Sequence, residues 1–152
     1  MNRKLIGLLA CIALTFAPAI AQTNLARLKS WDGKYPTEKR GKITHRLFGE
    51  PEIRTSLAKL LSKEDFDLLT KEYAVETPVV LGGDYLTVKV CKPHMCFEWG
   101  AFAINLATGT IYVRMATDES SRWFSSKGNQ SDLPRNVREY MEDFSKTEIG
   151  GR

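Results

Sequence analysis

The sequence predicts an α+β fold, an antiparallel β-sheet meander with helices packed on one side of the sheet. Three observations predict it. Apolar residues keep helical spacing between residues 51 and 73 and again between residues 134 and 144. Between these segments, from residue 75 to residue 115, β-rich stretches alternate with turn signals. Strands and helices are not interleaved, so an antiparallel sheet is favoured over a parallel one.

The first 21 residues have the parts of a secretory signal peptide. Two basic residues precede an apolar stretch, residues 5–21, which ends in the cleavage signal Ala19-Ile20-Ala21. Pro18 breaks this stretch, whereas a membrane span needs about 20 uninterrupted apolar residues. Two alternatives stay open, an uncleaved anchor helix and lipidation at Cys11, whose preceding residues resemble a lipobox. We expect cleavage after Ala21, export to the periplasm and no stable membrane anchor.

The mature chain is expected to be one small domain. Cleavage removes 21 of 152 residues and two of 22 Lys and Arg, so 131 residues with 20 basic and 18 acidic side chains remain. The net charge falls from +4 to +2, which predicts no nucleic-acid surface. We expect the domain core at residues 50–145, after an irregular segment at 22–49 and before a flexible tail at 146–152.

Helices are predicted on both sides of residue 62. Pro51 suits a first helical position, and apolar residues at helical spacing follow it. Ser62 begins a near capping box with Asp65, so a second helix is expected to start there. We interpret this helix–turn–helix layout as a cover for a sheet, because an export signal argues against DNA binding. Four side chains of the preceding segment are expected to pack onto the core, namely Trp31, Tyr35, Leu47 and Phe48.

Strands are predicted from residue 75 onward. Residues 75–81 are β-rich, and Gly82-Gly83-Asp84 is a turn signal. Tyr85 to Val90 alternates, so that every second side chain is apolar and faces one side. Residues 97–106 and 110–115 are two more strands, joined by a short hairpin turn that ends in glycine. Residues 121–124 are a candidate for a further strand.

A last helix is predicted after residue 132. Asp132 or Ser131 is the candidate cap, and Pro134 lies in the first turn. The apolar face is Val137, Tyr140, Met141 and Phe144.

The segment CKPHMC, residues 91–96, contains one of the two histidines and both cysteines that remain after cleavage. An even number of cysteines in an exported chain predicts a disulfide, here between Cys91 and Cys96. The chain-entropy estimate for so short a ring is about 2 kcal/mol, which a domain of this size does not need in order to fold. The bond is therefore expected to shape the loop.

Metal, redox and nucleophilic chemistry all fit this segment poorly. A structural zinc site needs four ligands, and the only histidine besides His94 is His45. Thioredoxin-like redox pairs have two residues between their cysteines, not four. The disulfide would consume the thiol of a Cys–His nucleophile, and no hydrolase, zinc-protease or phosphate-loop motif is present. We expect no cofactor, no metal and no enzymatic activity.

A binding function fits residues 91–96 better than metal, redox or nucleophilic chemistry. The disulfide and Pro93 restrict the loop before association, which lowers the entropic cost of binding. Lys92 supplies a positive charge, and His94 supplies ring N–H donors and gains a proton easily near carboxylates. Such a loop suits a cleft lined with acids. On these residues alone, a disulfide-closed hairpin end with His94 in solvent stays an open alternative.

CKPHMC resembles the CKPHDC loop of the periplasmic inhibitors of vertebrate lysozyme, the Ivy family. The setting is similar too, with an export signal, a glycine turn and strand at residues 81–86, and apolar strands after the loop. The chain as a whole is more similar to an uncharacterised group of exported Ivy-like bacterial proteins. That group shares a start like Trp31–Pro36, a C-x-P-H-x-C loop and a Thr-Gly hairpin.

The resemblance implies a mode of action. In that family the disulfide-closed loop enters the lysozyme cleft, where its histidine meets the catalytic carboxylates and blocks substrate. Carried over to this chain, Cys91 and Cys96 form the disulfide and His94 is the central contact. The target-binding loop is then Lys92, Pro93, His94 and Met95. Two positions depart from the family, since Met95 replaces an Asp and Phe97 replaces a Gly.

The sequence thus predicts a periplasmic protein inhibitor of lysozyme-type muramidases, with c-type lysozyme or another muramidase as its protein partner. The alternative is a non-inhibitory envelope binding module that engages a cell-wall fragment or an endogenous hydrolase.

Overall fold

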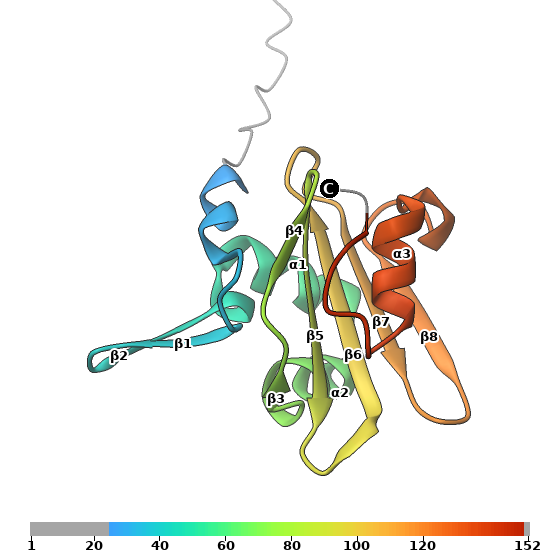
Figure 1. Cartoon of the computed structure of the whole chain (residues 1–152), viewed down its shortest axis with the longest axis horizontal. Helices are drawn as coiled ribbons and strands as arrows, with labels where there is room; N and C mark the ends of the chain where they lie inside the picture. The colour runs from blue at the N-terminus through green and yellow to red at the C-terminus, as the bar shows by residue number, and fades with distance from the viewer. Residues whose placement is uncertain (1–24, 151–152) are drawn as a thin grey trace, which may run out of the picture.

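The computed structural model describes residues 25–150 (Figure 1). The predicted signal peptide at residues 1–21 and Cys11 lie outside the described residues. Within the described part of the chain, no helix is long and apolar enough to cross a membrane. The predicted α+β class with an antiparallel sheet is confirmed.

A six-stranded antiparallel sheet forms the centre of the domain, in the order β3-β5-β6-β7-β8, with β4 paired to β5. Consecutive hairpins join β5 to β8, as the predicted meander requires. The predicted strand at residues 75–81 is interrupted at Pro78, which has no N–H to donate to a ladder. The strands are β3 (Val75–Glu76), β4 (Val80–Gly82), β5 (Tyr85–Lys92), β6 (Met95–Asn105), β7 (Ile111–Ala116) and β8 (Ser121–Ser125).

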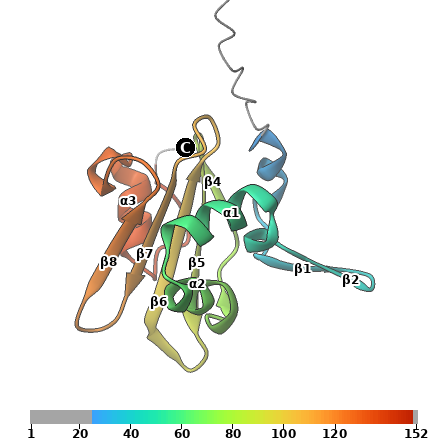
Figure 2. The ribbon, with the colours of Figure 1, turned by 180° about the vertical axis from the view of Figure 1, so that it is seen from behind.

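Helices from the first half of the chain cover one face of this sheet (Figure 2). These are α1 (Pro51–Leu60), α2 (Lys63–Asp67) and a π-helical turn, η3 (Leu68–Glu72). Ser62 caps α2 as predicted, because its hydroxyl accepts a hydrogen bond of 3.1 Å from the Asp65 N–H. Leu86, Val88 and Val90 of β5 face this layer, as their alternation predicts.

The last helix, α3 (Arg135–Glu142), packs on the opposite face, so the helices lie on both sides of the sheet and not on one (Figures 1 and 2). The physical reason lies in β5, where six consecutive residues from Leu86 to Cys91 are buried. A strand that is buried on both faces needs a second cover. Val137, Tyr140 and Met141 of α3 supply it.

Lys89 is the unexpected member of this second core. Its side chain is fully buried, and its ammonium group donates to the backbone carbonyls of Asp143 at 2.8 Å, Phe144 at 3.1 Å and Lys146. Nζ also lies 4.0 Å from the centre of the Tyr140 ring. Burial lowers the pKa of Lys89 to about 8. The side chain therefore ties the segment after α3 to the middle of the sheet.

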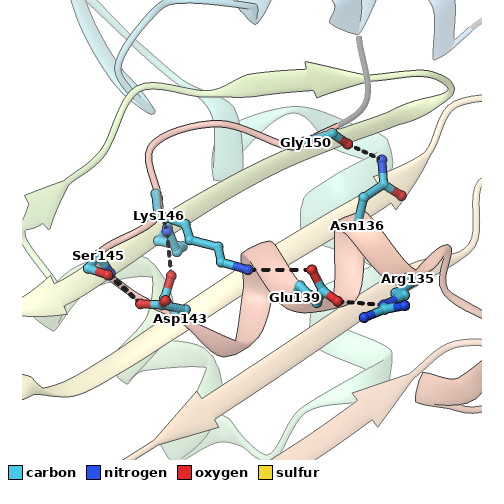
Figure 3. Close-up of polar contacts among 8 residues, drawn as sticks. Arg135, Asn136, Glu139, Asp143, Ser145, Lys146 and Gly150 are labelled. Carbon is cyan, nitrogen blue, oxygen red and sulfur yellow. Dashed lines mark hydrogen bonds and ion pairs between the residues drawn. The ribbon is translucent and has the colours of Figure 1, made fainter.

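The described part of the C-terminal segment contacts the domain, and the flexibility expected for residues 146–152 stays a prediction. Ile149 is buried, and a Cβ atom added to Gly82 would lie 2.8 Å from its Cδ1 atom. The Asn136 side chain donates a hydrogen bond of 2.8 Å to the Gly150 carbonyl (Figure 3). One apolar side chain in a polar stretch is enough to hold the tail against β4.

The predicted cap of α3 is wrong. Asp132 belongs to a separate 3-10 turn, η4 (Gln130–Asp132), and accepts a hydrogen bond of 2.9 Å from the Asn129 N–H. Asn129 and Asp132 form the capping box of this turn, so Asp132 does not cap α3. Ser131 lies inside the same turn, and Pro134 precedes α3 directly.

The segment before α1 is more regular than predicted. It holds the helical turns η1 (Leu25–Trp31) and η2 (Leu47–Gly49), and between them a two-stranded sheet of β1 (Thr37–Arg40) and β2 (Ile43–Arg46). Trp31, Leu47 and Phe48 are buried, as predicted. Tyr35 is 54% exposed, because it lies where the chain leaves the core to form the β1–β2 hairpin.

Candidate functional site

The disulfide loop, residues 91–96, lies at the end of the β5–β6 hairpin (Figure 1). The two strands pair without interruption up to Cys91 and Trp99. The register then shifts, and Lys92 pairs with Met95. The three residues after Met95, ending at Glu98, have no partner in the β5 ladder. Such a bulge bends the strand that carries it, here directly beside the loop.

Cys91 and Cys96 form a disulfide, as predicted, with their Cα atoms 5.0 Å apart. Cys91 is fully buried in the core on the α3 face, whereas Cys96 is exposed. The bond therefore links an exposed loop to a buried strand end. It limits the movement of the loop relative to the sheet.

Pro93 and His94 form the tip of the hairpin, and both are exposed. His94 has a φ of 63°, the only positive value at a non-glycine residue within residues 25–150. Histidine is among the side chains enriched in this left-handed region, and a proline followed by such a residue is the order of a type II turn. Among the described residues the His94 ring has no hydrogen-bond partner. Its ring nitrogens are therefore open to a partner.

Lys92, the predicted source of positive charge in the loop, is paired with an acidic side chain. Its Nζ atom lies 3.1 Å from Oε2 of Glu98, in the bulge of β6. Both side chains are partly exposed, so this ion pair contributes little to stability. It does neutralise the charge at the base of the loop.

Apolar side chains flank the disulfide loop. Phe97 is 44% exposed, Val75 is 41% exposed, and Met95 is half-buried. Val75 reaches this position because β3 pairs with β5 at Cys91. Large exposed apolar side chains are a feature of many interaction sites. The signal that could have found this flank is Phe97, an aromatic residue directly after the second cysteine.

A partly buried ion pair joins α2 to β8 at the same end of the sheet as the disulfide loop, with the Arg122 side chain 58% exposed (Figure 2). Arg122 donates two hydrogen bonds, of 2.5 and 3.2 Å, to the carboxylate of Asp65, whose side chain is 8% exposed. Burial raises the pKa of Asp65, but hydrogen bonds from Arg122 and Ser62 outweigh it and hold the pKa below its usual value. This pair stabilises the scaffold behind the loop.

Within residues 25–150, no three His, Cys, Asp or Glu side chains come together to hold a metal ion. A cavity of about 390 Å³ is lined by residues that include Leu25, Glu52 and Gly109. Gly109 belongs to the β6–β7 turn, so this cavity lies at the opposite end of the sheet from the disulfide loop. The loop is a projecting element, suited to insertion into a partner.

The family comparison agrees with this geometry. A protein-family model described as inhibitor of vertebrate lysozyme (Ivy) matches residues 52–147, a range that includes the whole central sheet and the disulfide loop. No curated protein and no solved structure matches the chain.

Proposed function

Because the chain belongs to the Ivy family, inhibitors of vertebrate lysozyme, we propose that it is a periplasmic inhibitor of lysozyme-type muramidases. The observation that carries the proposal is the exposed His94 at the tip of a hairpin that Cys91 and Cys96 close. In this proposal the loop enters the acidic active-site cleft and blocks the substrate, and the protein catalyses no reaction.

The chemistry of the cleft favours an imidazole. A retaining glycosidase holds its two catalytic carboxyl groups about 5 Å apart. A protonated imidazole has two N–H donors on opposite sides of one ring, so His94 can donate to both groups. Neighbouring carboxylates favour the charged form of histidine, and the water-excluding cleft strengthens the resulting charge-assisted hydrogen bonds. Each such bond contributes about 1.5–3 kcal/mol.

The rest of the loop would fix and surround this contact. Pro93, the left-handed backbone of His94 and the disulfide restrict the loop before it binds. Lys92, paired with Glu98, would support the base of the loop. Met95 and the neighbouring Phe97 would cover apolar surface at the rim of the cleft, which excludes water from the central contact.

The first test is inhibition itself. The chain from residue 22 onward is added to c-type, g-type and i-type lysozymes, and the rate of cell-wall lysis is followed by turbidity. We expect stoichiometric inhibition of at least one class. The mature charge of +2 gives no long-range attraction to a basic lysozyme, so inhibition should depend little on salt. An unchanged lysis rate for every class at tenfold excess of the chain would falsify the proposal.

The second test replaces His94 with Asn, which also tolerates a positive φ and so keeps the turn. Loss of the hydrogen bonds to the carboxylates should weaken inhibition by about 2–3 kcal/mol, or roughly 30- to 150-fold. The matched control is His45→Asn, the same chemical change at an exposed position in β2. We expect the control to inhibit like the wild type. Equal inhibition constants for the two variants would exclude the loop as the inhibitory element.

The alternative function, an envelope binding module without inhibitory activity, predicts a different pair of results. No lysozyme class would be inhibited, yet a cell-wall fragment or an envelope hydrolase would bind the wild type more tightly than His94→Asn. Isothermal titration with soluble peptidoglycan fragments, and pull-down from an envelope extract, measure this difference.

A further inference from the structure

The β1–β2 hairpin, residues 37–46, extends away from the rest of the domain (Figures 1 and 2). Nine of its ten residues are exposed and Glu38 is half-buried, so neither face packs on the core. Only its base is fixed, because Thr37 donates to the Glu76 carboxylate through its N–H at 3.0 Å and its hydroxyl at 2.7 Å. An isolated two-stranded hairpin is marginally stable in water. A binding partner could pack against the hairpin and stabilise it, because the core of the domain does not.

The hairpin concentrates positive charge. It carries four basic residues against a single acid, Glu38. Glu38 is already engaged, since Arg40 donates to it at 2.9 Å. The remaining part of the mature chain has 16 basic and 17 acidic residues, so the entire net positive charge comes from this element. The hairpin is therefore suited to an anionic partner, and basic lysozymes are not that partner.

Three of its cations have no ion-pair partner among the described residues, namely Lys39, Lys42 and Arg46. Thr37 and Arg46 are paired, as are Lys39 and Thr44, so Lys39 and Arg46 share one face of the hairpin. Lys42 lies in the turn, after Gly41. No carboxylate of the hairpin itself lies on this face or in the turn, although Glu76 of β3 meets the face at its base, where Thr37 donates to it.

Exposed apolar side chains lie at the tip and at the base of the hairpin. Ile43 pairs with Arg40, so it lies on the opposite face from Lys39 and Arg46, next to Lys42 of the turn. Ile43, beside the turn, is 64% exposed, the highest exposure of a large apolar residue in the described chain. Tyr35, at the base of the hairpin, is 54% exposed. Cations together with exposed aliphatic and aromatic side chains are typical of elements that lie in the headgroup region of a lipid bilayer. A nucleic acid would pair with the cations but offers no aliphatic environment for Ile43.

We propose that the β1–β2 hairpin binds reversibly to membranes that contain anionic phospholipids. The hairpin and the disulfide loop project from different parts of the domain in both views, so one molecule can use them at the same time (Figures 1 and 2). Membrane binding would hold the protein at the bilayer surface while the disulfide loop projects in another direction. The proposal does not depend on the identity of the loop's target.

The experiment measures co-sedimentation with sucrose-loaded vesicles of pure phosphatidylcholine and of phosphatidylcholine with 30% phosphatidylglycerol. The chain starts at residue 22, because the apolar residues 5–21 would themselves enter bilayers. The test variant carries Lys39→Gln, Lys42→Gln and Arg46→Gln. The matched control carries Lys29→Gln, Lys59→Gln and Lys127→Gln, three exposed cations outside the hairpin that leave the same net charge. Circular dichroism verifies that both variants are folded.

We expect the wild type to bind only the anionic vesicles. Each lipid-facing cation contributes about a fivefold factor to partitioning, so the hairpin variant should bind about 100-fold more weakly, and the control within about threefold of the wild type. Ile43→Ser, which leaves the charge unchanged, should also weaken binding. Lysozyme inhibition should be the same for both triple variants, which keeps this test separate from that of the disulfide loop.

Several results would overturn the proposal. Equal binding to neutral and anionic vesicles, or no binding to either, would remove the role of lipid charge. Equal losses in the two triple variants would show a general effect of net charge. Tight binding of a single-stranded oligonucleotide without vesicle binding would assign the hairpin to nucleic acid.

Discussion

At the scale of single residues, Gly100 determines how closely the helix layer approaches the sheet. It lies in β6, and a Cβ atom there would be 2.7 Å from Cδ1 of Leu69 and 3.4 Å from the Tyr73 ring. Leu69 is buried, so it has little room to move. Glycine in a strand interior often marks such a close approach. The sequence shows the glycine but not the helix that packs on it.

Gly100→Ala should destabilise the protein by about 1–3 kcal/mol, because the added methyl group overpacks this contact. Urea unfolding followed by tryptophan fluorescence measures the change in free energy. The matched control is Gly49→Ala, where the added atom would meet Arg46 Cβ at 3.5 Å, an ordinary contact. We expect less than about 0.5 kcal/mol there. Equal stability of Gly100→Ala and the control would refute the packing argument.

At the scale of elements, the disulfide loop depends on one covalent bond more than on packing. Both residues of its tip are exposed, and the Lys92–Glu98 pair at its base is exposed to solvent. The bond should therefore contribute more to the binding-competent shape of the loop than to the stability of the domain. Its effect on stability is expected to be about 2 kcal/mol.

A double variant separates these two contributions. Cys91→Ala with Cys96→Ser removes the bond and places an apolar side chain at the buried position and a polar one at the exposed position. We expect the free energy of unfolding to fall by about 2 kcal/mol and inhibition of a susceptible lysozyme to fall at least tenfold. Reduction of the wild type with a phosphine should reproduce both changes. Full inhibition by the folded double variant would mean that the loop keeps its shape without the bond.

At the scale of the whole molecule, the fold was predictable where its signals are local. The meander follows from alternating strands and glycine turns, and the predicted cap at Ser62 is confirmed. The burial of Lys89 was not predictable, because its carbonyl acceptors lie at residues 143–146, more than 50 positions away. A lysine in an alternating strand indicates a solvent-facing side. The order of the elements, helices then strands then a helix, does not show on which face each helix packs.

In the candidate site, too, the features that depend on neighbouring residues were predictable and those that depend on distant residues were not. The disulfide and the exposed tip follow from residues that are neighbours in sequence, Cys91 to Cys96. The Lys92–Glu98 pair and the exposed Val75 depend on the register shift in β6 and on the pairing of β3 with β5. Neither can be worked out from a hexapeptide. The partner of Lys92 therefore becomes visible only in the structure.

Lys89 also gives the molecule a specific pH dependence. The pKa of Lys89 is about 8 in the folded protein, because the side chain is buried, whereas an exposed lysine in the unfolded chain titrates near 10.5. Between these two values the unfolded chain binds more protons than the folded chain. The free energy of unfolding should therefore rise with pH across this window. Below about pH 8, Lys89 should cause no change of stability with pH. Burial raises the pKa of Tyr73 and Tyr140 above the usual 10, which opposes the trend only at higher pH.

Urea unfolding at intervals from pH 7 to pH 9.5, in the wild type and in Lys89→Met, isolates this contribution. Met keeps the length of the side chain but cannot donate to the carbonyls of Asp143, Phe144 and Lys146, so the variant should be less stable by about 1–3 kcal/mol at pH 7. Because Met does not titrate, the difference in stability between the two proteins should widen as the pH rises from 8 to 9.5. Hydrogen exchange of residues 143–150 should be faster in the variant, since Lys89 ties this segment to the sheet. A constant difference across the pH range would show that the pKa of Lys89 is not lowered in the folded protein.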